Sequence, residues 1–334
     1  MSTHTRLTAR TSSGRWRVLG YAIALAGLAL TWQAFATFVL PYDLIGNDGV
    51  TYLAAAERLA QGHDLYRIAP GDRLVFGLGS PCCPFPLMSP PPVAVLFLPL
   101  TILGPHLAVL LWDWVNAVAI VGTVGYLLVR LPLPTGICIV ALSLPLAVET
   151  LLGNVNGLLL AGTAVTWMLA ARGRSASAGA LVGIMAAVKL WPAVLILWFL
   201  TQRRYDVLPG FVAGIFVVGL LSLAGAGIDA HFEWLTVVVP ASVGQAPFAV
   251  FVEAGTGVHL PWIGYAILLV GSIEVWALRS RPRIAWAATV LTMVFGAPVF
   301  HVGTLILLFA ALIPWADRSP AVDIGAPSAR SVAV

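Results

Sequence analysis

Long, continuous runs of Leu, Ala and Val constrain the fold of this chain more than any other feature. The first run extends from about Val18 to Leu40. At a rise of 1.5 Å per residue, a helix needs about 20 apolar residues to cross a hydrocarbon core of about 30 Å. An outer-membrane barrel would show alternating segments of about ten residues instead. The runs therefore predict an all-α, polytopic transmembrane protein.

The composition excludes the other broad classes. Of 334 residues, 60% are hydrophobic and 10% are charged, and the mean hydropathy is +0.94. Soluble domains carry about a quarter charged residues. The net charge of +4 comes from basic residues spread along an apolar chain, so it does not indicate a nucleic-acid partner.

The N-terminus carries a basic segment, residues 1–17, ahead of the first apolar run. This order resembles a signal peptide, but the run is about twice as long as a signal-peptide core. It also lacks a small-residue cleavage site before Pro41. We therefore expect an uncleaved first membrane span.

The most polar part of the chain follows, from Pro41 to Ser89, and it must lie outside the hydrocarbon. The next segment, Pro90–Gly104, is apolar but too short to cross the membrane comfortably. We expect it to form a re-entrant or interfacial helix on the outer side, within an outer loop covering residues 41–105.

The remaining apolar runs bring the expected total to about ten spans. They are His106–Val129, Leu133–Leu151, Asn156–Ala171, Ser175–Val188, Trp191–Thr201, Val207–Ala226, His259–Leu278, Ile284–Val299 and Phe300–Trp315.

These spans place 14 of the 18 basic residues on one side, with Arg58, Arg67, Arg73 and Lys189 on the other. The positive-inside rule makes the arginine-rich side cytoplasmic. Both termini are then cytoplasmic in a multi-pass protein of the cell membrane. We expect one transmembrane domain at 18–316 and a disordered cytoplasmic tail at 317–334.

Several spans are short, which predicts a cavity where helix hairpins end below the outer surface. Acidic residues map to that side: Asp43, Asp48, Glu57, Asp64, Asp72, Glu149, Asp229, Glu233 and Glu253. Asp113 and Glu274 instead lie within spans. Each is either a functional carboxylate or a hydrogen-bonding group between helices.

Asp48 stands just ahead of an Ala-rich segment with Leu53, Ala56, Leu59 and Ala60 on one face. This pattern predicts an amphipathic helix lying flat on the membrane. Asp48 is then either its N-cap or a general base that takes a proton from an incoming hydroxyl.

Lys189 is the only lysine, and it stands between an apolar helix and the helix-breaking Pro192. Its ammonium either snorkels to the interface or meets a lipid-linked phosphate at the rim of the cavity. His301, at another outer turn, is either structural or catalytic.

The three cysteines, Cys82, Cys83 and Cys138, form neither a disulfide framework nor a metal-ligand spacing. The adjacent pair is either redox-active or simply two small loop residues. The outer acidic residues show no clear Asp-x-Asp pair, so no metal site is expected.

Five sequence elements in order resemble glycosyltransferase family 87. They are Asp48 with Tyr52, Ala55, Ala56, Gly62 and Tyr66; Pro90-Pro91-Pro92 with Leu98-Pro99-Leu100; Glu149 with Gly153-Asn154-Val155-Asn156; Lys189-Leu190-Trp191-Pro192; and Val299-Phe300-His301. The resemblance covers roughly residues 40 to 310.

The resemblance implies a GT-C fold and inverting transfer of a sugar, mannose first, from a polyprenyl-phosphate donor to a cell-envelope glycolipid or glycan on the extracytoplasmic side. It makes Asp48 the general base, and it implies neither a cofactor nor an obligatory metal. Further roles follow by the same resemblance: Lys189, His301 and Arg58 for the donor phosphate, and Tyr52, Tyr66, Glu149, Asn154 and Asn156 for the sugar or acceptor.

Three alternatives stay open: an arabinofuranosyltransferase using polyprenyl-phosphate arabinose, a transporter or flippase of a lipid-linked sugar, and an inactive binding scaffold. Transporters often show inverted repeats and polar sites at the membrane midplane. Here no repeat is evident and the polar residues gather at one face, which favours the enzyme.

Overall fold

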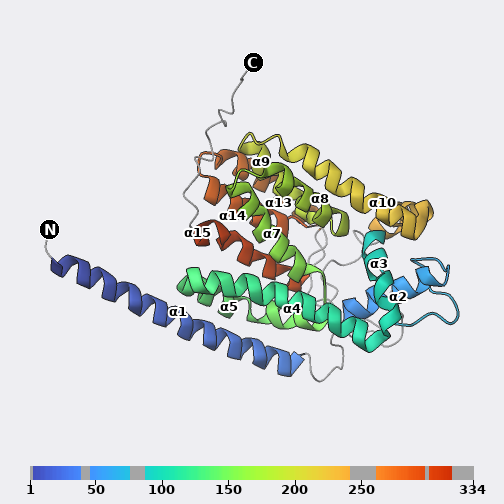
Figure 1. Cartoon of the computed structure of the whole chain (residues 1–334), viewed down its shortest axis with the longest axis horizontal. Coiled ribbons are helices and arrows are strands. Elements are labelled where there is room, and N and C mark those ends of the chain that lie inside the picture. The colour runs from blue at the N-terminus through green and yellow to red at the C-terminus, as the bar shows by residue number, and fades with distance from the viewer. Residues whose placement is uncertain (1–2, 39–45, 76–86, 241–260, 298–300, 318–334) are drawn as a thin grey trace, which may run out of the picture.

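A computed structural model describes residues 3–38, 46–75, 87–240, 261–297 and 301–317 (Figure 1). These residues form helices and no strand. The elements are α1 (Thr3–Phe38), α2 (Asn47–Ala60), α3 (Pro91–Phe97), η2 (Leu98–Leu103), α4 (Pro105–Arg130), α5 (Pro132–Ala141), α6 (Ser143–Leu152), α7 (Asn156–Ala171), α8 (Ser175–Val188), η3 (Trp191–Val194), α9 (Leu195–Thr201), α10 (Val207–Glu233), η4 (Trp234–Val238), α13 (Pro261–Ala277), α14 (Pro282–Phe295), η5 (Val302–Leu312) and α15 (Ile313–Ala316).

Among the described residues, three helices are long and apolar enough to cross a membrane: Gly14–Phe38, Pro105–Arg130 and Val207–Val238. A bent pair, Pro132–Ala141 with Ser143–Glu149, brings the number to four if it counts as one span. The prediction of a helical membrane protein is confirmed, whereas the count of about ten spans is not. The other apolar helices are shorter than 18 residues.

The segment predicted as one straight span, Leu133–Leu151, is broken. Helices α5 and α6 meet at 68°, and Leu142 between them has the non-helical angles φ −105° and ψ 18°. Pro145 lies in the first turn of α6. Since proline has no N–H and its ring clashes with the carbonyl four residues earlier, the helix restarts before it.

The segment Pro90–Gly104 forms two short pieces, α3 and the 3₁₀ helix η2. Pro91 occupies the first turn of α3, where its missing N–H costs nothing. Gly104 ends η2 with a φ of 74° and leads into α4. Together the pieces fall below the length of a membrane span, in agreement with the sequence prediction.

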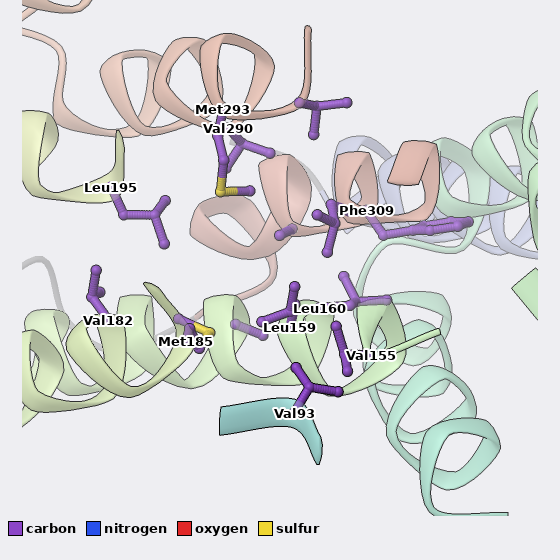
Figure 2. Close-up of a cluster of buried hydrophobic side chains, with 14 of the residues drawn as sticks. Val93, Val155, Leu159, Leu160, Val182, Met185, Leu195, Val290, Met293 and Phe309 are labelled. Carbon is purple, nitrogen blue, oxygen red and sulfur yellow. The ribbon is translucent and has the colours of Figure 1, made fainter. Parts of the chain in front are cut away.

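The apolar core lies where α7 and α8 face α14 and η5. Figure 2 shows side chains from both sides pointing toward one another. Buried members labelled there are Val93, Val155, Leu159, Leu160, Val182, Met185, Leu195, Val290, Met293 and Phe309. The C-terminal ends of α6 and α8 lie beside this core, and Glu149, Asn154 and Lys189 stand at or just after these ends.

Helix α2 differs from the predicted surface helix. Its residues from Thr51 to Ala56 are all buried, on every side of the helix. It packs against α3, η2, α4 and α6 (Figure 1). The run of small alanines explains the difference, because it lets neighbouring helices approach α2 closely on faces that looked polar in the pattern.

Helices α8 and α10 pack backbone to backbone through glycines. A Cβ at Gly179 or Gly183 of α8 would collide with the carbonyls of Val207 and Phe211, and one at Gly214 of α10 with the carbonyl of Ala180. Small residues spaced four apart are a common device for close packing of membrane helices.

Replacing Gly214 by Leu is expected to destabilise the protein by more than the ~1–3 kcal/mol typical of overpacking, because helix backbone cannot move aside as a side chain can. The control is Gly219→Leu on the same helix, where an added Cβ meets nothing within 4 Å. The measurement is the thermal transition of the purified protein in detergent. Equal transitions for the two variants would contradict the close packing.

Candidate active site

Asp48 lies inside the first turn of α2 and is not its N-cap. The N-cap is Gly46, whose φ of 76° is left-handed, and it provides no side-chain hydrogen bond to the helix. The Asp48 carboxylate is therefore free for another partner. Its Oδ2 accepts a short hydrogen bond from Nδ2 of Asn154, 106 residues along the chain.

The turn between α6 and α7 supplies two asparagines. Helix α6 ends at Leu152 and is capped by Gly153, which adopts φ 59° and ψ 36°, a conformation that glycine reaches without strain. The chain then reverses into α7, which begins at Asn156. Nδ2 of Asn156 donates to Oε2 of Glu149 at 2.9 Å.

Lys189 joins the two asparagines. It follows α8 with extended backbone angles, φ −153° and ψ 123°. Its Nζ donates to Oδ1 of Asn154 at 3.2 Å and to Oδ1 of Asn156 at 2.9 Å. Asp48, Asn154, Lys189, Asn156 and Glu149 thus form one chain of hydrogen bonds, which we call the Lys189 network.

The network places one cation between two carboxylates without direct ion pairing to either among the described residues. An ammonium has three N–H donors. The described residues accept from two of them, and both acceptors are neutral amide oxygens. Within the described part of the chain, the third N–H of Lys189 has no acceptor, so this donor can serve a ligand.

Burial shifts the pKa values of Asp48 and Lys189, the two charged groups that Asn154 connects. It raises the pKa of the Asp48 carboxyl above its ordinary value of 3.8, while the Asn154 hydrogen bond and the Lys189 charge act in the opposite direction. Burial lowers the pKa of Lys189, and the carboxylates of Glu149 and Asp48 oppose that shift. A carboxylate with a raised pKa is a stronger base once ionised.

His301 and Tyr52 lie next to the network. Burial and the Lys189 charge lower the pKa of His301 to about 4, so its ring is neutral near pH 7. Burial and the Asp48 carboxylate raise the pKa of the Tyr52 hydroxyl well above its ordinary value. Both groups therefore keep a proton that they can donate in a hydrogen bond. Gly303, two residues after His301, lies against Glu149.

The two remaining predicted site residues, Arg58 and Tyr66, lie away from the network. The guanidinium of the buried Arg58 donates twice to the carbonyl of Leu65, at 3.2 and 2.9 Å. The Tyr66 hydroxyl donates to the carbonyl of Ser89 at 3.0 Å. Both side chains stabilise the segment after α2 through hydrogen bonds to backbone carbonyls. The structure does not bring either side chain to Lys189.

A supporting surface on α4 was not predicted. Trp112 donates its indole N–H to the carbonyl of Gly153 at 2.6 Å, and its ring packs edge-on against Tyr52 at a centroid distance of 6.3 Å. No periodicity or motif marks Trp112, because its partners are distant in sequence. A tryptophan beside the intramembrane acid Asp113 is the one local hint.

Other predicted features lie elsewhere or outside the described residues. Cys82, Cys83, the segment 298–300 and the tail from 318 are outside them. Glu274 lines a mostly apolar cavity of ≈ 400 Å³ between α13 and α14 that includes no residue of the network. Within the described ranges, no three His, Cys, Asp or Glu side chains gather as metal ligands do.

Comparison with known protein families gives a match over most of the chain. Residues 88–320, well over half of the chain, match the model of glycosyltransferase family 87. The matched segment includes Glu149, the two asparagines, Lys189 and His301, and Asp48 precedes it. No curated protein and no solved structure matches the chain.

Proposed function

Because the chain belongs to glycosyltransferase family 87, we propose that it transfers a sugar, mannose first, from a polyprenyl-phosphate donor to a glycolipid or glycan of the cell envelope. The active site is the Lys189 network, and it faces the extracytoplasmic side. The charge distribution supports this orientation, since 14 of the 18 basic residues fall on the opposite side of the predicted spans.

One observation carries the proposal: the half-buried ammonium of Lys189 is held by two amide oxygens and has a third N–H for which the described residues supply no acceptor. A phosphodiester leaving group gains negative charge as its bond to the sugar breaks. A preorganised cation in a water-poor site stabilises that developing charge far better than water does. A single lysine suits a lipid phosphate with a single negative charge.

The reaction we propose is a single inverting displacement. Asp48 accepts the proton of the acceptor hydroxyl, and the acceptor oxygen attacks the anomeric carbon of the donor sugar. The bond between that carbon and the phosphate oxygen breaks, and its electron pair stays on the phosphate. The products are the glycosylated acceptor and the polyprenyl phosphate, and the proton leaves on Asp48.

The neighbouring groups support the leaving phosphate and the sugar. His301, neutral near pH 7, donates a ring N–H rather than a positive charge. Glu149 keeps one buried oxygen, Oε1, without a hydrogen-bond partner among the described residues, and a sugar hydroxyl would satisfy it. The Tyr52 hydroxyl, which is hydrogen-bonded to Ser89, lies close enough to Asp48 and Glu149 to interact with their charges. Asn154 and Asn156 hold these groups around Lys189.

The test supplies purified full-length protein with radiolabelled polyprenyl-phosphate mannose and a membrane lipid extract. Polyprenyl-phosphate arabinose and a nucleotide-activated mannose serve as parallel donors. We expect label transfer from a lipid-linked donor and none from the nucleotide sugar. Label transfer from polyprenyl-phosphate arabinose alone would identify arabinose as the donor sugar and leave the proposed mechanism unchanged.

A transporter gives a different pattern in the same material. Reconstituted in vesicles, it would move the lipid-linked sugar between leaflets without forming a glycosidic bond. Absence of transfer from every lipid-linked donor, together with movement of donor across the bilayer, would replace the enzyme by the transporter.

A further inference from the structure

Asp113 is a carboxylate within the long apolar helix α4, and the proposed reaction does not use it. One of its oxygens, Oδ1, is buried and has no hydrogen-bond partner among the described residues. A buried polar atom without a partner is uncommon in a folded protein and calls for an explanation. Its surroundings provide one.

The carboxyl group of Asp113 lies between two turns, one at Gly46 before α2 and one at Gly153 after α6. A Cβ built on Gly153 would lie 2.5 Å from Oδ1, and one built on Gly46 would lie 2.8 Å from Oδ2. Each oxygen thus faces one turn. The turns also touch each other, because the Cβ position of Gly153 is 3.0 Å from Cα of Gly46.

Both turns lead directly into the Lys189 network. Asp48 follows Gly46 by two residues, and Asn154 follows Gly153 by one. The hydrogen bond between Asp48 and Asn154 therefore joins the two segments that follow these turns. The Asp113 carboxyl lies between the turns, so it sets the distance between the two segments.

The chemistry of a carboxyl group also suits the start of α2. Gly46 at the N-cap has no side chain, so the first N–H groups of α2 lack the usual cap. The N-terminus of a helix carries a partial positive charge that favours a nearby acidic group. An apolar side chain of the same size would fill the space on α4 but would not interact with this charge.

We propose that Asp113 is a positioning residue for catalysis: its carboxyl group, fixed on α4, holds the Gly46 and Gly153 turns at the spacing that lets Asp48 and Asn154 meet. Asp113 acts through Asp48 and touches no reacting atom. The catalytic part of this proposal rests on the proposed function, whereas the structural part does not.

The first test is independent of activity. Backbone hydrogen exchange is measured on the full-length protein carrying Asp113→Leu, Asp113→Asn or Glu274→Leu, the last replacing an acid of α13 that lies outside the Lys189 network. We expect Asp113→Leu to speed exchange over residues 46–52 and 153–157 and to leave α8 and α10 unchanged. Asp113→Asn should be intermediate, and Glu274→Leu should match the unaltered protein in both turns.

The second test separates positioning from general damage. With the donor that the unaltered protein uses, Asp113→Leu should lower kcat about 100-fold, the loss expected when a reacting group is misplaced by about 1 Å. The donor KM should change less than kcat, because Lys189 follows α8 and stands on neither of the two turns. In the Asp48→Asn background, Asp113→Leu should cause little further loss.

Two results would overturn the proposal. One is unchanged exchange in both turns of Asp113→Leu. The other is a loss of kcat that is equally large with and without Asp48, which would mean that Asp113 does not act through Asp48. If the unaltered protein is inactive with every donor, the proposed function fails, and the exchange experiment still decides whether Asp113 holds the two turns.

Discussion

Asp48→Asn is expected to reduce sugar transfer by about 100- to 10,000-fold, the range by which a positioned general base accelerates a reaction. The substitution keeps the size of the side chain and removes its ability to accept a proton. The new side chain can present its amide oxygen to Nδ2 of Asn154, so the hydrogen bond is kept while Oδ1 of Asn154 still accepts from Lys189. The loss should therefore appear in kcat, with folding and the donor KM nearly unchanged.

Helix α2 provides a matched control. Glu57 lies on the same helix and forms an exposed ion pair with Arg73 at 2.8 Å, away from Asn154. Exposed pairs of this kind contribute little to stability, so Glu57→Gln should fold normally and keep its activity. Full transfer by Asp48→Asn would remove Asp48 from the role of base, and equal losses in both variants would indicate a general effect on α2.

The pH dependence gives a second measure of the same role. A base works only when ionised, so kcat falls as the pH drops through the pKa of Asp48. Burial raises that pKa above 3.8. The acidic limb of the rate profile should therefore lie at a higher pH than an ordinary aspartate would give, and Asp48→Asn should have no such limb in its residual activity.

The boundaries of the helices could be predicted closely where glycine and charged residues interrupt the apolar runs. Helices α7 and α8 begin and end at the predicted residues, Asn156–Ala171 and Ser175–Val188. Between them stands Arg172-Gly173-Arg174, where a glycine with a φ of 73° ends one helix and the arginines interrupt the apolar run. The bend at Leu142 was missed because Pro145 falls inside a continuous apolar stretch.

The members of the network could be anticipated, but their connections could not. Asp48, Glu149 and Lys189 stand out because charges are scarce in this chain. That the lysine would reach the carboxylates through Asn154 and Asn156 depends on how three distant turns pack together. A single sequence contains no signal for such pairings.

Arg58 illustrates the opposite case. It is one of four basic residues on the predicted outer side, and the family resemblance implied a place for it at the donor phosphate. The structure turns its guanidinium to the carbonyl of Leu65, seven residues along the chain. A buried backbone carbonyl needs a donor as much as a phosphate does, and charge counting cannot distinguish the two partners.

Lys189→Met should be the second most damaging change in the site. Removing a preorganised donor to a developing negative charge costs about 100- to 1000-fold in kcat. Methionine has nearly the length of lysine without the charge. It would also leave Oδ1 of both Asn154 and Asn156 without their donor, so thermal stability should be measured alongside transfer.

Lys189→Arg and a chemical probe separate charge from geometry. Arginine keeps the charge, but its planar fork does not reproduce the compact ammonium between two amide oxygens, so we expect partial activity. Because Lys189 is the only lysine, an amine-directed reagent modifies one side chain besides the N-terminus. Bound polyprenyl-phosphate sugar should slow its modification. Equal labelling rates with and without donor would argue against phosphate binding at Lys189.

The pH profile of Lys189→Met distinguishes a catalytic cation from a merely structural one. The Lys189 charge lowers the pKa of Asp48, so its removal lets burial raise that pKa further. The acidic limb of the residual rate should move to higher pH in Lys189→Met and stay in place in Lys189→Arg. A structural lysine would lower the amount of folded enzyme without moving the limb. A shift therefore requires that Lys189 and Asp48 act on each other in the working site.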